Sequence, residues 1–550
     1  MPNIEVPVLI VGGSLVGIST ALLLAHHGIR PLVVEHHRGT AIHPRAAMIT
    51  QRTMEVFRTV GVEQIVMKKS DEQFVQDGAI MAVETLAGKE LAWFIANLNE
   101  GVRDVSPSLR LFITQSLLEP LLKERAEELG AQLRFSTEMI SFDEDAGGIT
   151  AEIRHRDTGE TATVRAKYMV AADGAHSRIR ERLGIRMLGH GVFSKSITIY
   201  FRGDVGSLLR GRNLSVIYVV NPTLSGFFRI EKPFTSGFLA VHWLGDPKAP
   251  VTDVSAGLTN ERALELLYAG LGTREVPVTI ESIMHWDATA DTAERFQQGR
   301  IFLVGDAAHV MPPSGGFGGN TGVQDAHNLA WKLAMVLKGE AGPELLSTYE
   351  SERRPASAFT VEQAYSRYVT RSAPYLKSDN MQTIQNDLNI ELGYCYHSSA
   401  VIPDQDEKTL PHDNPRDTRA RPGTRAPHLD LERNGQRLST LDLFGQKFVL
   451  LAAPQGEAWC SAAREASGQL KLGMDVYEVG AAGLTDPSGK FSDTYGITPK
   501  GAVLVRPDGF VAWRAKDSTG ASAATLASVL ASLLSRAPAE SSLRAEKSRA

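Results

Sequence analysis

The sequence predicts an α/β protein in which a Rossmann-like nucleotide-binding domain carries an inserted β-sheet domain and is followed by a thioredoxin-like domain. Three glycine-bearing stretches, residues 8–17, 170–177 and 301–309, each continue an apolar run typical of a buried parallel strand. Between the last two stretches, residues 189–286 show the period-2 alternation of a largely antiparallel sheet. With 550 residues the chain exceeds one hydrophobic core, so we expect two or three domains.

The first stretch predicts a strand, a tight turn and a helix of the dinucleotide-binding type. Val8–Val11 is an apolar strand, and residues 15–27 have helical spacing. A second strand over residues 31–34 leads to Glu35, whose carboxylate is placed to accept hydrogen bonds from ribose hydroxyls. The glycines allow close approach to a pyrophosphate, and the helix N-terminus favours its charge. The turn residues expected to contact the nucleotide are Gly12, Gly13, Ser14, Leu15, Val16 and Gly17, with Ser14 in place of the usual second glycine.

Four further motifs accompany this turn. They are Pro44-Arg45-Ala46, Gln115 at the start of a helix, Asp173-Gly174, and Gly305-Asp306. In this order the motifs resemble the single-component flavin aromatic hydroxylases, the family of para-hydroxybenzoate hydroxylase, phenol hydroxylases and aromatic-polyketide hydroxylases. The resemblance implies that the Rossmann-like domain binds FAD in the manner of para-hydroxybenzoate hydroxylase and that the inserted sheet caps a substrate pocket.

The resemblance also implies a role for each motif. The first turn would hold the ADP half of FAD, and Asp173-Gly174 would serve both FAD and NAD(P)H binding. Asp306 of Gly305-Asp306 would lie on the ribityl chain. Arg45 would lie near the pyrophosphate, and Gln115 near the ribityl or phosphate region.

A glycine-rich run, residues 312–320, precedes a helix expected over residues 319–337. Its glycines let backbone N–H groups approach a flavin ring, and the positive end of the helix would stabilise negative charge on the N1–C2=O edge of reduced flavin. We expect Gly318, Gly319 and Asn320 to fill that role. By resemblance, the carbonyl of Pro313 would face the substrate.

The activity implied by the resemblance is hydroxylation of a phenolic or polycyclic aromatic substrate through a flavin C4a-hydroperoxide, with consumption of NADPH or NADH and of O2. Two alternatives stay open: Baeyer–Villiger or epoxidising oxygenation on the same scaffold, and a non-catalytic binding protein of this fold. A base that takes the phenol proton would help hydroxylation. The sheet offers Tyr200, Tyr218, His242 and His285, but each is interpreted as an ordinary sheet residue, and no catalytic residue is assigned.

Composition excludes other classes. A net charge of −5 and a pI near 6.3, without a Lys/Arg cluster, argue against a nucleic-acid partner. The histidine pairs His26-His27 and His36-His37 would face apart on regular structure, and no metal site is expected. The apolar stretch over residues 6–25 is interpreted as a buried strand and helix rather than a membrane span. With two cysteines, the chain suits a reducing cytoplasm.

The expected domains follow from these motifs. A helix over residues 344–353 should end before Pro355. Cys460 is followed by Ser-Ala-Ala, so the thioredoxin-like domain lacks a Cys-x-x-Cys pair and is expected to be structural or to support a dimer. Monomer and homodimer both remain open. The expected divisions are 1–75, 105–188 and 287–400 for the FAD-binding domain; 76–104 and 189–286 for the substrate domain; 401–427 for a linker; 428–537 for the thioredoxin-like domain; and 538–550 for a disordered tail.

Overall fold

The first domain is a three-layer α/β unit. The computed structural model describes residues 3–42, 48–246, 248–404, 410–481 and 483–536. The central sheet has the order β16-β17-β10-β1-β2-β7, and the hairpin β8–β9 joins it through β10. Strand β1 pairs in parallel with both β10 and β2, so the carboxyl ends of these strands meet at one edge. The strands are β1 (Asn3–Val11), β2 (Leu32–Val34), β7 (Gln132–Arg134), β8 (Thr137–Asp145), β9 (Gly148–His155), β10 (Thr161–Ala171), β16 (Gln297–Gln298) and β17 (Ile301–Leu303).

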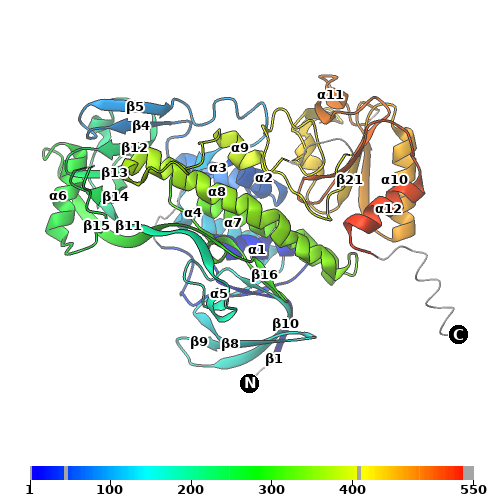
Figure 1. Cartoon of the computed structure of the whole chain (residues 1–550), viewed down its shortest axis with the longest axis horizontal. Coiled ribbons are helices and arrows are strands. Elements are labelled where there is room, and N and C mark those ends of the chain that lie inside the picture. Colours follow the sequence, from blue (N-terminus) through cyan, green and yellow to red (C-terminus); the bar gives the residue numbers. More distant parts are fainter. Residues whose placement is uncertain (1–2, 43–47, 247, 405–409, 482, 537–550) are drawn as a thin grey trace.

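Helices cover this sheet on the side that faces the rest of the molecule (Figure 1). Helix α1 (Leu15–His26) is almost entirely buried, because it packs between the sheet and helix α7 (Phe317–Leu337). The remaining helices of the first domain are α2 (Gln51–Thr59), α3 (Glu63–Gln73), α4 (Gln115–Glu128) and α5 (Arg178–Arg182). A two-stranded ribbon, β3 (Met48–Ile49) with β6 (Leu111–Phe112), lies beside them.

The inserted domain is an eight-stranded sheet of order β18-β15-β11-β14-β13-β12-β4-β5. Its pairings are antiparallel except for that of β12 with β4, which is parallel. Helix α6 (Asn260–Leu271), which is not among the predicted elements, packs its apolar side on one face. The strands are β4 (Ala79–Val83), β5 (Glu90–Ile95), β11 (Met187–Arg202), β12 (Leu214–Val220), β13 (Leu224–Glu231), β14 (Ser236–Leu244), β15 (Thr279–Ala293) and β18 (His309–Val310).

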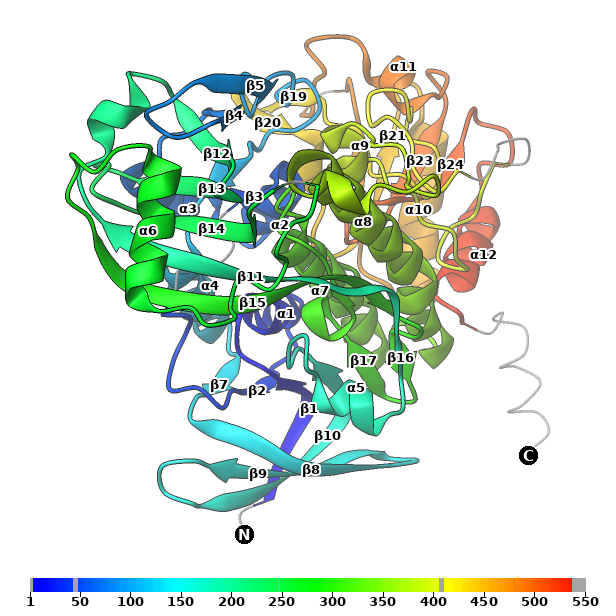
Figure 2. The ribbon, with the colours of Figure 1, turned by 60° about the vertical axis from the view of Figure 1, so that its left-hand side comes forward.

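A long helix joins the domains. Helix α8 (Thr348–Ser372) runs from the first domain towards the inserted sheet (Figures 1 and 2). The prediction that Pro355 ends this helix is wrong, because Pro355 lies inside it. Proline removes one backbone hydrogen bond. One side of the helix is buried both before and after Pro355, from Tyr349 and Arg353 to Ala356 and Thr360, and this packing outweighs that loss.

The C-terminal unit lies on the opposite side of the molecule from the inserted sheet (Figures 1 and 2). Its sheet has the order β22-β21-β23-β24, with α10 and α12 on one face and α11 on the other. Trp331 of α7 belongs to the same apolar cluster as α10 and α12, so this unit shares a core with the first domain. Its elements are β21 (Phe448–Ala452), α10 (Glu457–Leu470), β22 (Met474–Glu478), α11 (Phe491–Tyr495), β23 (Ala502–Val505), β24 (Val511–Ala515) and α12 (Ala523–Leu533).

The segment expected to be a linker is packed rather than solvated. Residues 410–427 contain no helix or extended strand, but many of them are buried. Arg425 forms a buried ion pair with Glu55 of α2. The expected disordered tail, residues 538–550, lies outside the described residues. Within the described part of the chain, no helix is long and apolar enough to cross a membrane.

Candidate functional site: a nucleotide cradle beside an aromatic sheet face

The three predicted glycine motifs meet at the carboxyl edge of the first sheet. Gly12 has φ +105°, and a Cβ there would lie 2.2 Å from the carbonyl oxygen of Ala172, directly before the second motif. A Cβ on Gly17 would lie 1.9 Å from the oxygen of Gly12. Gly305 of the third motif has φ +58° and would place a Cβ 2.9 Å from Val16. Only glycine permits this close approach of three chain segments.

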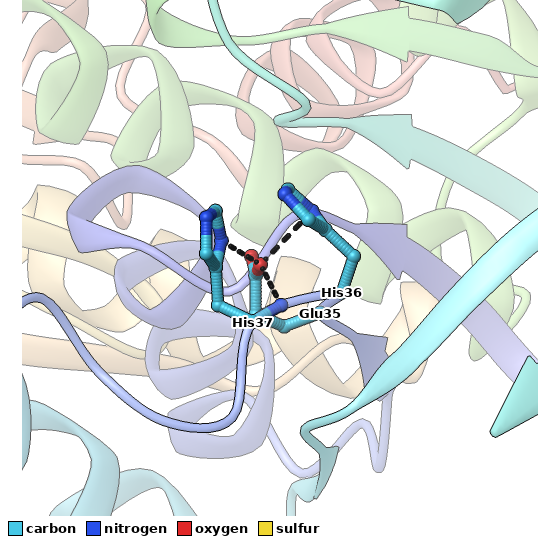
Figure 3. Close-up of side chains that lie close together, drawn as sticks. All are labelled: Glu35, His36 and His37. Carbon is cyan, nitrogen blue, oxygen red and sulfur yellow. Dashed lines mark hydrogen bonds and ion pairs between the residues drawn. The ribbon is translucent and has the colours of Figure 1, made fainter. Parts of the chain in front are cut away.

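Glu35 ends β2 beside the first turn, as predicted (Figure 3). Its carboxylate accepts hydrogen bonds from the backbone N–H groups of Gly13, at 2.6 Å, and His37, at 2.8 Å. Burial alone would raise the pKa of this carboxyl, but these two N–H donors and the His37 side chain hold it below its ordinary value. Glu35 is therefore a buried carboxylate poised in its charged, hydrogen-bond-accepting form.

The rings of His36 and His37 both turn towards Glu35 (Figure 3). Their centroids are 3.8 Å apart, so the expectation that this pair faces apart is wrong. The reason is local: both residues lie in the loop after β2, where the alternation of a strand no longer applies. The three side chains bring potential metal-ligand atoms within 4.8 Å of one another. The carboxylate they share is the one predicted for ribose, which places the cluster at the nucleotide site.

The start of α1 is held by a carboxylate that sequence reasoning missed. Glu119 of α4 is fully buried and accepts hydrogen bonds from the Gln115 side chain and the Ala41 N–H, both at 2.6 Å. The N–H of Leu15 also faces it, and burial raises the pKa of this carboxyl. Gln115 and Glu119 are one helical turn apart, and that spacing was the available signal. Ser14 caps α1 without a side-chain hydrogen bond and is exposed.

Asp173 offers one open acceptor. Its Oδ2 accepts a hydrogen bond from the N–H of Ile179 at 3.2 Å, whereas its buried Oδ1 has no partner among the described residues. Burial raises the pKa of this carboxyl. Gly174, with φ +85°, has nothing within 4 Å of an added Cβ, so the backbone beside Asp173 is open. This orphaned oxygen fits a site that receives a donor from a ligand.

Helix α7 presents free N–H groups where the sequence predicts them. The helix begins at Phe317, two residues before its expected start, and Gly316 precedes it in the left-handed region with no side-chain cap. The N–H groups of the N-cap and of the first three helical residues lack intrahelical partners, and with Gly316 as the N-cap these include the N–H groups of Gly318 and Gly319. An added Cβ on Gly318 would meet only Met311, at 3.7 Å, so this side of the helix end has room for a ligand.

The side chain of Asn320 has a role that was not predicted. Its Oδ1 accepts from the N–H of Thr50 at 2.9 Å, and its Nδ2 donates to the carbonyls of Met48 and Gly316 at 2.8 and 2.7 Å. Asn320 thus ties the β3 strand to the turn that opens α7. The Pro313 carbonyl accepts from the N–H of Gly316 at 2.9 Å and so belongs to the same turn. Arg45 lies outside the described residues.

A buried cluster of charged and polar side chains around Asp325 holds the Gly305-Asp306 motif in place. Asp325 of α7 accepts from the N–H of Gly305 at 3.1 Å, from His309 Nε2 at 2.7 Å and from Arg353 Nε at 2.8 Å. Burial would raise the pKa of Asp325, but His309 and Arg353 hold it below its ordinary value. Asp306 itself is exposed at the surface of the cradle.

The face of the inserted sheet that looks away from α6 is lined with aromatic side chains. Phe227 lies within 6.0 Å, centroid to centroid, of Tyr218, Phe238 and His242. Tyr200 contacts Phe238 on the same face. Of the four proposed bases, three therefore share this face. His285 pairs with Ile197, which packs under α6, and it is exposed.

This aromatic face reaches the start of α7 through Met48. Met48 pairs with Phe112 and packs against the apolar cluster that contains Phe112 and Tyr218. A Cβ added to Gly316 would lie 2.9 Å from the Cβ of Met48. At the far end of the face, a cavity of about 460 Å³ opens between α3, α4 and the sheet. Tyr200, Gln73 and Glu231 are among its lining residues. His242 is buried, and burial lowers its pKa to about 3, which leaves it neutral and weakly basic.

Two sequence families match the chain. The FAD binding domain family matches residues 5–364, and the aromatic-ring hydroxylase C-terminal family matches residues 419–537. The 4-methyl-5-nitrocatechol 5-monooxygenase of a Burkholderia species is 52% identical over 97% of this chain and 98% of its own. The tetracenomycin A2 monooxygenase-dioxygenase of Streptomyces glaucescens is 38% identical over 98% of both chains.

Solved structures of two similar proteins have the same fold as this chain. Aklavinone-11 hydroxylase, in a ternary complex with FAD and aklavinone, superposes with a TM-score of 0.89 at 36% identity and covers 98% of this chain and 100% of its own. The flavin-dependent monooxygenase PieE, in complex with FAD and substrate, gives 0.87 at 34% identity over the same shares. Fold and cradle therefore define a flavoprotein monooxygenase. The chain belongs to the FAD-dependent aromatic-ring hydroxylases, enzymes that use FAD and NAD(P)H and act with O2 on small aromatic molecules.

Proposed function

We propose that this enzyme hydroxylates a single-ring phenol of the nitrocatechol type. The observation that carries the proposal is the aromatic sheet face, which joins the open N-terminus of α7 through Met48. Flat aromatic walls select flat aromatic substrates by stacking. The 52% identity to the nitrocatechol monooxygenase, against 38% to the tetracenomycin enzyme, favours a single ring over a polycyclic one.

FAD is proposed to lie along the cradle. Bound FAD would supply the electron transfer and oxygen activation, while the chain's own residues bind and orient it. The first turn and Glu35 would hold the ADP half, Asp306 the ribityl chain, and the N–H groups of Gly318, Gly319 and Asn320 the flavin ring edge. The orphaned Oδ1 of Asp173 and the space beside Gly318 support this arrangement.

Three finer assignments belong with the proposal. The domain divisions expected from the sequence are kept as a proposal, and the separate sheets of the three units support them. A cytoplasmic location is supported by two cysteines that are both buried free thiols. A monomer or homodimer is proposed as the working form; NADPH and NADH are equal candidates as reductant.

The test is NAD(P)H and O2 consumption by the FAD-loaded protein with 4-methyl-5-nitrocatechol and, separately, with 1,2-dihydroxyanthraquinone. Strong stimulation by the nitrocatechol, with a hydroxylated product identified by mass, is the expected result. Stimulation by the anthraquinone alone would move the substrate class to polycyclic phenols. An ester or epoxide product would replace ring hydroxylation by the Baeyer–Villiger or epoxidising alternative. Reductant oxidation that neither compound stimulates would contradict the proposal.

A further inference from the structure

Arg229 is an exception among the buried arginines of the described chain. Nine arginines are buried, and eight of them donate hydrogen bonds to carboxylates or carbonyls. Arg229 is 5% exposed, and among the described residues it donates no hydrogen bond and has both Nε and Nη2 buried without a partner. A buried guanidinium with unused donors is costly unless an acceptor is supplied.

The packing around Arg229 holds it in position without satisfying it. Its guanidinium carbon lies 3.8 Å from the ring centre of Phe112 and 4.5 Å from that of Phe74. Ring faces attract a cation but accept no directional hydrogen bond in the guanidinium plane. The nearby carboxylate of Glu231 is engaged by the Gln73 side chain at 3.3 Å. Burial lowers the pKa of Arg229 to about 9, with Glu231 opposing that shift.

Arg229 lies on the aromatic face. It is two residues from Phe227 on β13, so both side chains point to the same side of the sheet. It pairs directly with Phe238, which in turn pairs with Tyr200. Phe112, which covers Arg229, pairs with Met48, the residue that contacts Gly316 at the start of α7. Arg229 therefore lies on the aromatic face, and Phe112 and Met48 connect it to the start of α7.

We propose that Arg229, on the aromatic face, binds the anionic oxygen of the aromatic substrate and so selects phenolates over neutral rings. This assignment rests on the proposed function, because it needs an aromatic substrate on this face. A planar guanidinium offers two parallel N–H donors to a phenolate or to the adjacent oxygens of a catecholate. The aromatic rings on either side would bind the ring of the same molecule. Ionised substrate is also the electron-rich form that hydroxylation requires, so binding and activation coincide.

The experiment measures binding to the oxidised, FAD-loaded enzyme by calorimetry. The probes are 4-methyl-5-nitrocatechol, studied as its anion, and its dimethyl ether, which cannot ionise. The wild-type enzyme is expected to bind the anion at least about tenfold more tightly than the ether, which is the usual worth of a charge-assisted hydrogen bond. Arg229→Met should lose that preference while binding the ether unchanged, and Arg229→Lys should retain part of it.

The control is Arg274→Met. Arg274 also lies over an aromatic ring, that of Tyr268, 5.1 Å away, but it is exposed in the turn that follows α6, the helix on the other face of the sheet. The Arg274→Met enzyme should bind both probes as the wild type does. Anion binding unchanged in Arg229→Met, or equal binding of the two probes by the wild type, overturns the assignment.

Two further outcomes are separable. If Arg229→Met fails to fold, as judged by flavin content and circular dichroism, the comparison is made with Arg229→Lys and the two probes. A wild-type enzyme that binds neither probe is titrated with 1,2-dihydroxyanthraquinone and its dimethyl ether. Binding there transfers the same comparison to a polycyclic ring. If the wild-type enzyme binds neither the nitrocatechol pair nor the anthraquinone pair, the proposed function is overturned, and the assignment of Arg229 with it.

Discussion

At the scale of single residues, the cradle requires positions without a Cβ atom. Gly12, Gly17 and Gly305 lack a side chain where the backbone passes close to other residues. The contacts of Gly12 with Ala172 and of Gly305 with Val16 join motifs that are distant in sequence, whereas Gly17 contacts Gly12 within the first turn. These contacts are predictable, because the glycine patterns and their order carry them. The hydrogen bonds of the Asn320 and Glu119 side chains are not, because they join partners that only the folded chain brings together.

Replacing Gly12 by alanine should abolish FAD retention. The added Cβ would lie 2.2 Å from the Ala172 carbonyl oxygen, on backbone that cannot give way without moving β10. The measurement is the ratio of flavin to protein absorbance after gel filtration. Gly468→Ala is the matched control, because nothing lies within 4 Å of an added Cβ there. A Gly12→Ala protein that elutes with full flavin would refute the predicted turn.

Replacing Asn320 by alanine should loosen the start of α7. Three hydrogen bonds to Thr50, Met48 and Gly316 would be lost, leaving buried backbone groups unsatisfied. We expect the free energy of unfolding to fall by about 2–4 kcal/mol. Urea titration measures this change. Weaker flavin binding should accompany it. Stability within about 0.5 kcal/mol of the wild type would show that the ribbon is held by packing alone.

At the scale of elements, sequence periodicity predicts most strands and helices, but long-range packing decides their ends. The sequence predicts a largely antiparallel sheet over residues 189–286, and the strands from β11 to β15 confirm it. The predicted helix end at Pro355 is wrong because proline preference is a local rule, whereas tertiary contacts stabilise this helix on both sides of the proline. The linker expected over residues 401–427 stays a prediction, but composition did not indicate that Arg425 in it would form a buried ion pair with Glu55.

The joint between α8 and the C-terminal unit is a buried charge network. Glu352 of α8 accepts from Lys332 at 2.8 Å and from two nitrogens of Arg506 at 2.6 and 2.9 Å. Arg506 also pairs with Asp508 in the turn between β23 and β24. All four residues are at most 2% exposed, so each charge depends on its partners for stabilisation.

Replacing Arg506 by methionine should therefore destabilise the protein by about 3–5 kcal/mol, because Glu352 and Asp508 lose their principal partner in a dry environment. Urea unfolding measures the change. Arg437→Met provides the comparison: it removes a pair with Asp430 on the surface, and its effect should stay below about 1 kcal/mol. Equal effects for the two variants would show that the network contributes no more than a surface pair.

At the scale of the whole molecule, three histidines are buried in the neutral form. Burial lowers the pKa of His27 and of His242 to about 3 and holds that of His327 well below its ordinary value of 6.5. The unfolded chain takes up these protons near pH 6.5 and the folded chain does not. The free energy of unfolding is therefore retained above pH 6.5 and falls below it, by up to about 1.4 kcal/mol per pH unit for each histidine.

The thermal midpoint should accordingly drop between pH 6.5 and about pH 5, before most carboxylates titrate. Scanning calorimetry across this range measures the slope. His242→Phe keeps an aromatic ring among Phe227, Trp286 and Tyr368. This variant should lower the dependence of the thermal midpoint on pH by about the contribution of one histidine. An unchanged slope would show that His242 is protonated in the folded protein.

The ion pairs between the ends of the chain have a consequence for how the protein is made. Glu55 lies in the second helix, but its partner Arg425 and the Asp508 carbonyl that receives Arg52 are synthesised hundreds of residues later. While the ribosome is still adding the C-terminal third, Glu55 has Arg52 beside it but lacks Arg425, the second of its two buried arginine partners. The polypeptide therefore reaches its final state only after release, and a chain cut short before residue 425 would be a substrate for chaperones and proteases rather than a smaller enzyme.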